Sequence, residues 1–159
     1  FNLAQATSVV AERSVQSTEA LFGTLLHEVM ALVDVPQDLG RALSRSNAKE
    51  RLGTIQYERL FKKAKEIVTH EKLTAFFDPA NTPYKERALF ATKGELLRPD
   101  RFVITPDRKV FLLDYKTGKY SESHANQLDE YAKYLSEQGL NVKQKLLVYC
   151  GKNLIFKEV

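Results

Sequence analysis

The chain has 159 residues, 43% of them hydrophobic and 28% charged, which is typical of a soluble globular protein and leaves room for one domain with a sizeable core but not for two ordinary ones. Its net charge of +4 is compatible with a polyanionic partner without establishing one. The single cysteine, Cys150, excludes an internal disulfide and a cysteine-ligated iron–sulfur cluster built from this chain alone.

The start of the chain carries no targeting signal that we can identify. No apolar run approaches the roughly 20 residues that cross a bilayer, and no basic segment followed by an apolar one marks a signal peptide. We therefore expect a cytoplasmic protein with no membrane partner. The chain begins with Phe1 rather than Met, so we also expect it to be a fragment of a longer polypeptide.

The first half of the chain has helical periodicity. Residues 1–16 are weakly patterned and predict either a linker or a leading helix, whereas residues 17–33 repeat apolar side chains at helical spacing and end before Pro36. Further helical regions are predicted over 36–52 and 54–77. The last of these has an apolar face made of Leu60, Ala64, Ile67 and Val68, and an exposed basic face made of Arg59, Lys62, Lys63 and Lys65.

Beyond residue 83 the pattern changes to strands. They are predicted over 84–92, 95–105 (one bent strand or two short ones), 110–116, 143–150 and 153–159. A helix over 124–138, capped by Ser123 and ended by Gly139, separates the third strand from the fourth. Because that helix allows a parallel crossover, the order predicts an α/β or α+β sandwich with a mixed sheet.

The segment with the most candidate catalytic residues runs from residue 98 to residue 118. A turn that starts at Pro106 joins two strands, and this hairpin could bring Asp100 close to Asp114. Side chains alternate along a strand, so Asp114 and Lys116 share one face. Two carboxylates and an ammonium group can hold a divalent cation and an activated water.

Each of these residues also has an ordinary interpretation. An acid and a base at the end of a strand commonly form a surface ion pair that contributes little, and Asp100 could be a turn aspartate between two arginines. The apolar pair Leu112–Leu113 favours the functional interpretation of Asp114, since a carboxylate leaving a core strand is costly unless a cation compensates it.

These motifs resemble those of the PD-(D/E)XK nuclease superfamily. Pro99–Asp100 followed by Asp114–Tyr115–Lys116 resembles its short signature. Three further likenesses point to the RecB-like subgroup: Gly23 and His27 on an early helix, Gly118 two residues after Lys116, and the pair Gln127 and Tyr131. The resemblance covers the chain from about residue 21 to its end, and it is greatest to the C-terminal nuclease domain of RecB/AddA-type helicase–nucleases.

The resemblance implies a fold, an activity and a site. The fold would be α/β, a mixed central sheet flanked by helices in a restriction-endonuclease-like core, with an N-terminal helical segment. The activity would be Mg²⁺-dependent cleavage of DNA, with Mn²⁺ as a possible substitute. The catalytic residues would be Asp100, Asp114 and Lys116, and the metal ligands would be His27, Asp100, Asp114 and the backbone carbonyl of Tyr115.

Other residues receive supporting or DNA-binding roles. Glu86 is expected to support the site, in preference to Glu95, and Gln127 with Tyr131 is expected to touch phosphates or steady the lysine. Candidate phosphate contacts are Arg98, Arg101, Lys119 and the basic face of the 54–77 helix. His70 and His124 lack a spacing that would bring them to the site and are expected on the surface.

The resemblance also implies a context. The whole of 1–159 would be one RecB-like nuclease domain, with DNA as its partner, a helicase motor in the same polypeptide, a partner repair subunit, and a nucleoid-associated location in a bacterial-type cell. The alternatives are a catalytically silent DNA-binding or scaffold module, a stand-alone exonuclease, and a restriction enzyme or junction resolvase of the same superfamily. The iron–sulfur branch of the subgroup is disfavoured because it needs four cysteines.

Overall fold

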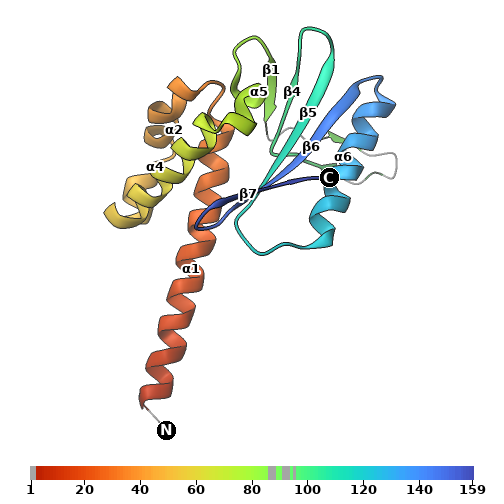
Figure 1. Cartoon of the computed structure of the whole chain (residues 1–159). Coiled ribbons are helices and arrows are strands. Elements are labelled where there is room, and N and C mark those ends of the chain that lie inside the picture. The colour runs from red at the N-terminus through yellow and green to blue at the C-terminus, as the bar shows by residue number, and fades with distance from the viewer. Residues whose placement is uncertain (1–2, 86–88, 91–93, 95) are drawn as a thin grey trace.

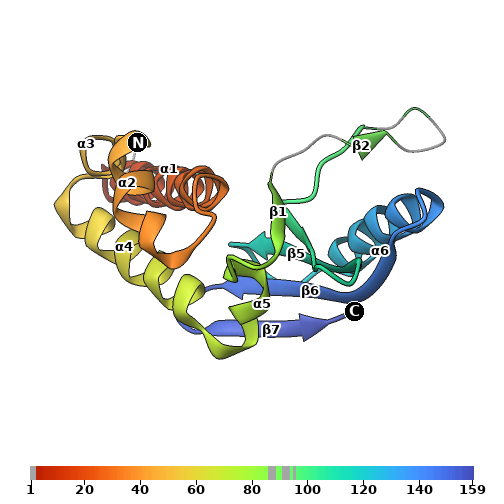
Figure 2. The same cartoon turned by 90° about the horizontal axis from the view of Figure 1, so that it is seen from above.

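The computed structural model describes residues 3–85, 89–90, 94 and 96–159. A five-stranded sheet in the order β1-β4-β5-β6-β7 forms the centre of the molecule (Figure 1), and a two-stranded β2-β3 sheet lies apart from it (Figure 2). The strands are β1 (Thr82–Lys85), β2 (Leu89–Phe90), β3 (Leu96–Leu97), β4 (Arg101–Ile104), β5 (Lys109–Lys116), β6 (Asn141–Cys150) and β7 (Leu154–Glu158).

Helices come before the sheet and between β5 and β6. The α-helices are α1 (Leu3–Ala31), α2 (Leu39–Arg45), α3 (Ala48–Leu52), α4 (Thr54–Thr69), α5 (Thr74–Phe77) and α6 (Glu122–Glu137), and two 3₁₀ turns cover Pro36–Asp38 and Glu71–Leu73. The lower part of α1 projects away from the rest of the molecule (Figure 1).

The connections between strands confirm the predicted mixed sheet. β4 pairs antiparallel with both β1 and β5, and β6 pairs antiparallel with β7. β5 and β6 are parallel because α6 carries the chain back across the sheet between them. The carboxyl end of β5 and the start of α6 therefore meet at one edge of the sheet.

Two apolar cores cover the two faces of the sheet. One core joins α1, α2 and α4 to residues such as Leu113 and Tyr115 of β5. The other joins α6 to Leu112 of the same strand and to Leu147 of β6. The alternation of side chains along β5 thus supplies both cores, as its pattern predicts.

The helices lie where the sequence predicts them, but two of the predicted helical regions are interrupted. α1 is a single helix from Leu3, so the described part of 1–16 is a leading helix and not a linker. The 36–52 region divides where Asn47 adopts a left-handed backbone, with φ of 51°. The 54–77 region divides at His70, whose extended backbone ends α4 and whose ring accepts a hydrogen bond from the backbone N–H of Lys72.

The prediction that Lys63 is exposed is wrong. Its side chain is 9% exposed, and Nζ donates to Glu66 Oε2 at 2.9 Å and to the carbonyl of Lys152 at 3.2 Å. The alkyl part of the side chain can line the core while the ammonium reaches polar partners. The predicted apolar face of this helix is confirmed, because all four of its residues are buried.

The strand predictions are confirmed in order but corrected in extent. The single strand predicted over 84–92 contains the end of β1 and all of β2, which belong to different sheets. β1 starts at Thr82, before the predicted 84, and residues 86–88 and 91–93 lie outside the described residues. The region predicted over 95–105 contains two short strands, β3 and β4. The cap of α6 is Ser121, which accepts a hydrogen bond from the backbone N–H of Ser123, and not Ser123 itself. Among the helices that the structure describes, none is long and apolar enough to cross a membrane.

Candidate active site

The β4–β5 hairpin brings Asp100 and Asp114 together. Its register pairs Arg101 with Leu113, which places Asp100 beside Asp114 at the edge of the sheet. The backbone N–H of Asp100 donates to Asp114 Oδ1 at 3.0 Å, and the backbone N–H of Tyr115 donates to Asp100 Oδ2 at 2.8 Å. Each carboxylate is therefore oriented by the backbone next to the other, as expected from the hairpin.

Lys116 lies on the same face as Asp114, as the alternation predicts. Its Nζ is 3.0 Å from Asp114 Oδ2 and donates to Gln127 Oε1 at 2.9 Å. β5 supplies the lysine and α6 supplies the glutamine, so the helix that follows β5 fixes the ammonium group over the carboxylates. The expectation that Gln127 could steady the lysine agrees with this contact.

His27 reaches the same cluster from α1. Its Nδ1 lies 3.0 Å from Asp100 Oδ1, and its ring meets the ring of Tyr115 edge-on at 6.1 Å. The helix can approach this closely because Gly23, one turn earlier, faces Thr117 at the end of β5. A Cβ at Gly23 would lie 2.7 Å from Thr117 Oγ1.

Burial makes the Asp114 carboxylate difficult to ionise. Burial first, and the nearby Asp100 carboxylate second, raise the pKa of Asp114 from 3.8 to about 6, although Lys116 opposes them. Only 4% of the side chain is exposed. Two carboxylates that share a cramped site repel one another, and a bound cation would relieve that repulsion.

The donor set suits a divalent metal in its chemistry. Two carboxylates and an imidazole nitrogen are ligands for Mg²⁺ or Mn²⁺. Among the described residues, however, no three acidic, histidine or cysteine side chains are arranged as a metal-binding group. The carboxylate oxygens instead contact His27, Lys116 and backbone N–H groups.

The residues predicted to support the site or to bind DNA lie in different environments. Tyr131 is 2% exposed, and its hydroxyl donates to the carbonyl of Arg98 at 3.2 Å, which ties α6 to the segment before Asp100. The Arg98 and Lys119 side chains are exposed near the site's strands. Glu86, predicted as a supporting residue, lies outside the described residues, as does Glu95.

The prediction that Arg101 contacts phosphate is corrected. Its side chain is 1% exposed, and its guanidinium donates to three backbone carbonyls, those of Phe76, Val33 and Asp34, at 2.8, 2.6 and 3.0 Å. It also lies over the ring of Phe77 at 4.3 Å. Arg101 thus joins β4 to the ends of α1 and α5, and its burial keeps the guanidinium away from DNA.

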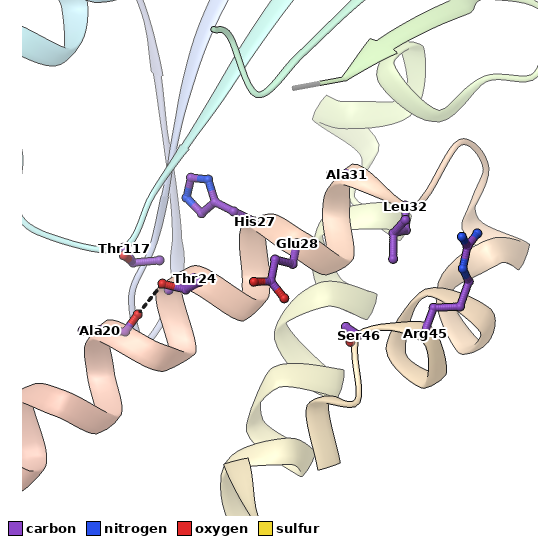
Figure 3. Close-up of a pocket in the computed structure, with 10 residues that line it drawn as sticks. Ala20, Thr24, His27, Glu28, Ala31, Leu32, Arg45, Ser46 and Thr117 are labelled. Carbon is purple, nitrogen blue, oxygen red and sulfur yellow. Dashed lines mark hydrogen bonds between the residues drawn. The ribbon is translucent and has the colours of Figure 1, made fainter. Parts of the chain in front are cut away.

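A pocket of about 780 Å³ lies along α1 beside His27 (Figure 3). Its lining includes Thr24, Thr117 and Arg45, which the sequence motifs did not indicate. Figure 3 shows the His27 ring directed toward the strands, while Glu28 points to the other side of α1. Arg51 pairs with Glu28 at 2.6 Å, so Arg45 supplies the positive charge of this pocket lining.

His124 lies closer to the site than its spacing suggested. Its Nδ1 is 2.9 Å from the Tyr149 hydroxyl, and burial together with the nearby Lys116 charge lowers its pKa. Tyr149 is the β6 register partner of Lys116 on β5, which explains the proximity. The sequence did not predict which residues of β5 and β6 pair, so it gave no signal that His124 would lie near Lys116. His70 is partly exposed and packs against Phe156, on the face of the sheet opposite to Tyr149.

Known protein families and solved structures offer a comparison for the whole chain, including the site. A family model described as the PD-(D/E)XK nuclease superfamily matches residues 3–157, which include every residue of the site described above. No curated protein matches the chain. Among solved structures, the chain is similar to the crystal structure of SSO0001, with 18% sequence identity, a TM-score of 0.36, and coverage of 91% of this chain and 77% of that one.

Proposed function

Because the chain belongs to the PD-(D/E)XK nuclease superfamily, we propose that it is a metal-dependent deoxyribonuclease that hydrolyses phosphodiester bonds. The observation that carries the proposal is the single network of Asp100, Asp114 and Lys116 at the edge of the sheet. A surface ion pair would not need two abutting carboxylates, one of them almost completely buried.

Asp100, Asp114, His27 and the backbone carbonyl of Tyr115 would hold Mg²⁺, or Mn²⁺ in its place. When bound, the metal would lower the pKa of a water and neutralise charge on the phosphate. The Lys116 ammonium, held by Asp114 and Gln127, would orient the attacking water or stabilise negative charge on the phosphate oxygens. Arg45 in the pocket, Arg98 and Lys119 would contact phosphates of the same DNA.

The RecB-like motifs support a narrower proposal. Gly23 faces Thr117 and lets His27 reach Asp100, and Gln127 accepts a hydrogen bond from Lys116. These contacts support a functional role for both motifs. We propose that residues 1–159 form one nuclease domain of a helicase–nuclease that processes double-strand DNA breaks, with a stand-alone exonuclease as the alternative. A motor and a repair subunit would then be its protein partners.

A catalytically silent DNA-binding module is the second candidate. It is favoured because the Asp100 and Asp114 oxygens already contact protein groups. The described residues also contain no cluster of three side chains arranged to bind a metal. The two candidates differ in cleavage but not in DNA binding.

The test is incubation of the chain with labelled single- and double-stranded DNA in Mg²⁺, Mn²⁺ or EDTA. We expect metal-dependent cleavage that Asp114→Ala abolishes, with the fold intact, and that Lys116→Ala lowers by roughly 10² or more. Arg41→Ala, an exposed arginine on α2, is the matched control and should leave the rate unchanged. DNA binding without cleavage by the unaltered chain would favour the silent module.

A further inference from the structure

A row of aromatic and basic side chains begins at Lys116 and crosses the sheet. Tyr149 of β6 is the register partner of Lys116, and Lys157 of β7 lies on the same face, opposite Leu147. Tyr120, in the connection between β5 and α6, lies above this row, with its ring 6.1 Å from the ring of Tyr149. The mechanism proposed above uses Lys116 alone from this row.

Tyr120 is exposed yet held in place. Half of its surface, 50%, is open to solvent, whereas Tyr149 beneath it is 8% exposed. The Lys157 ammonium lies 3.6 Å from the centroid of the Tyr120 ring, a close cation–π contact. Tyr149 is itself fixed by its hydrogen bond to His124. An aromatic ring that is open, oriented and flanked by lysines is pre-organised to bind a flat anionic ligand.

Single-stranded nucleic acid has the chemistry that this row fits. Proteins that bind single strands place aromatic rings where bases can stack and place basic side chains along the phosphates. A base inside a duplex is already stacked on both sides, so a protein ring can stack only on an unpaired or terminal base. Lys157 at the ring and Lys119 next to Tyr120 in the chain supply positive charge, while Lys116 pairs with Asp114, the acid of the row.

We propose that Tyr120 and Lys157 form a subsite that stacks on an unpaired base of the DNA strand whose phosphate lies at Lys116. This inference rests on the proposed nuclease function and deepens it, because it assigns a single-stranded substrate or a frayed end. Tyr120 supplies the stacking surface, and Lys157 supports the ring and contacts a flanking phosphate. Tyr149 and His124 are positioning residues that hold the ring without touching the DNA.

The test measures binding, in EDTA, of a fluorescein-labelled oligothymidylate and of an abasic oligomer of equal length, which keeps the phosphates but has no bases. Tyr120→Leu should weaken oligothymidylate binding by roughly tenfold or more and leave abasic binding unchanged, because one stacked base is lost. Tyr120→Phe should stay within about twofold, since it keeps the ring. Ile55→Ala, an 83% exposed apolar residue on α4, is the control.

Lys157→Gln tests the electrostatic part separately. It should weaken both oligomers and lower the slope of log Kd against log salt by about 0.7, the value for one phosphate contact on a single strand. Equal weakening of the two oligomers by Tyr120→Leu, or no weakening of either, would overturn the stacking subsite.

The outcomes separate this inference from the function on which it rests. If the unaltered chain cleaves DNA but Tyr120→Leu binds oligothymidylate normally, the subsite is wrong and the nuclease proposal stands. If Tyr120→Leu selectively loses oligothymidylate binding but no metal supports cleavage, the subsite stands and the nuclease proposal is wrong. If the subsite and the nuclease proposal are both right, Tyr120→Leu should slow cleavage of single strands more than cleavage of blunt duplexes.

Discussion

Asp100 and Arg101 are neighbours in the chain, but they belong to two differently built regions. Arg101 is a buried charge whose guanidinium donates to three backbone carbonyls, in a region that joins α1, α5 and β4. Asp100 belongs to a carboxylate pair in which burial, and then the Asp100 charge, raise the pKa of Asp114. A buried charge can therefore stabilise a fold when backbone carbonyls surround it, whereas an incompletely compensated one marks a place kept for chemistry.

The largest expected effect on stability comes from the Arg101 region. Arg101→Met removes three hydrogen bonds and leaves the carbonyls of Phe76 and Val33 buried without a donor. We expect the free energy of unfolding to fall by at least about 3 kcal/mol, measured by urea denaturation. Arg45→Met, on the exposed pocket wall, should change it by less than about 0.5 kcal/mol. An equal response of the two variants would remove the contrast between the regions.

The carboxylate region should respond in the opposite direction. The folded-state pKa of Asp114 is raised, so the folded protein holds this proton to a higher pH than the unfolded chain. Stability from this group is therefore present at low pH and is lost as pH rises from about 4 through about 6, by roughly 3 kcal/mol in metal-free buffer.

Asp114→Asn should remove this pH dependence and be more stable than the unaltered chain at neutral pH. Denaturation curves at several pH values in EDTA measure the difference. Asp78→Asn, an exposed aspartate, is the control and should keep the dependence of the unaltered chain. A loss of stability on substitution of Asp114 would mean that its contact with Lys116 outweighs burial.

The contact between Gln127 and Lys116 should have a smaller effect on catalysis. Gln127→Ala leaves the lysine held by Asp114 alone, so we expect cleavage to slow by roughly tenfold with little change in stability. The comparison is with Gln138→Ala at the far end of α6. A rate equal to that of the unaltered chain would show that Asp114 is sufficient to position the ammonium.

The smallest expected effect concerns the contact of α1 with the end of β5. Gly23→Ala would place a Cβ 2.7 Å from Thr117 Oγ1, which requires a local shift costing about 1 kcal/mol. Thr117→Ala removes that oxygen, so the double variant should recover most of the loss in thermal stability. An additive loss in the double variant would show that Thr117 is not the obstacle.

Local patterns predicted most of this fold and of its site. Alternation placed Asp114 and Lys116 on one face, and the hairpin turn brought Asp100 beside them. Long-range register was beyond those patterns. The parallel pairing that sets Tyr149 next to Lys116 joins residues with no local signal. Arg101 was expected to be exposed because it follows an acid in the chain. The carbonyls that accept its hydrogen bonds come from helix ends distant in the sequence, which no local pattern indicates.

Asp114→Asn, assayed on one preparation for both unfolding free energy and DNA cleavage, tests whether the carboxylates at this edge are kept together for chemistry at a cost to stability. The account predicts a variant that is more stable than the unaltered chain at neutral pH in EDTA and that no longer cleaves DNA in Mg²⁺. A variant that is less stable and still cleaves at the original rate would contradict it.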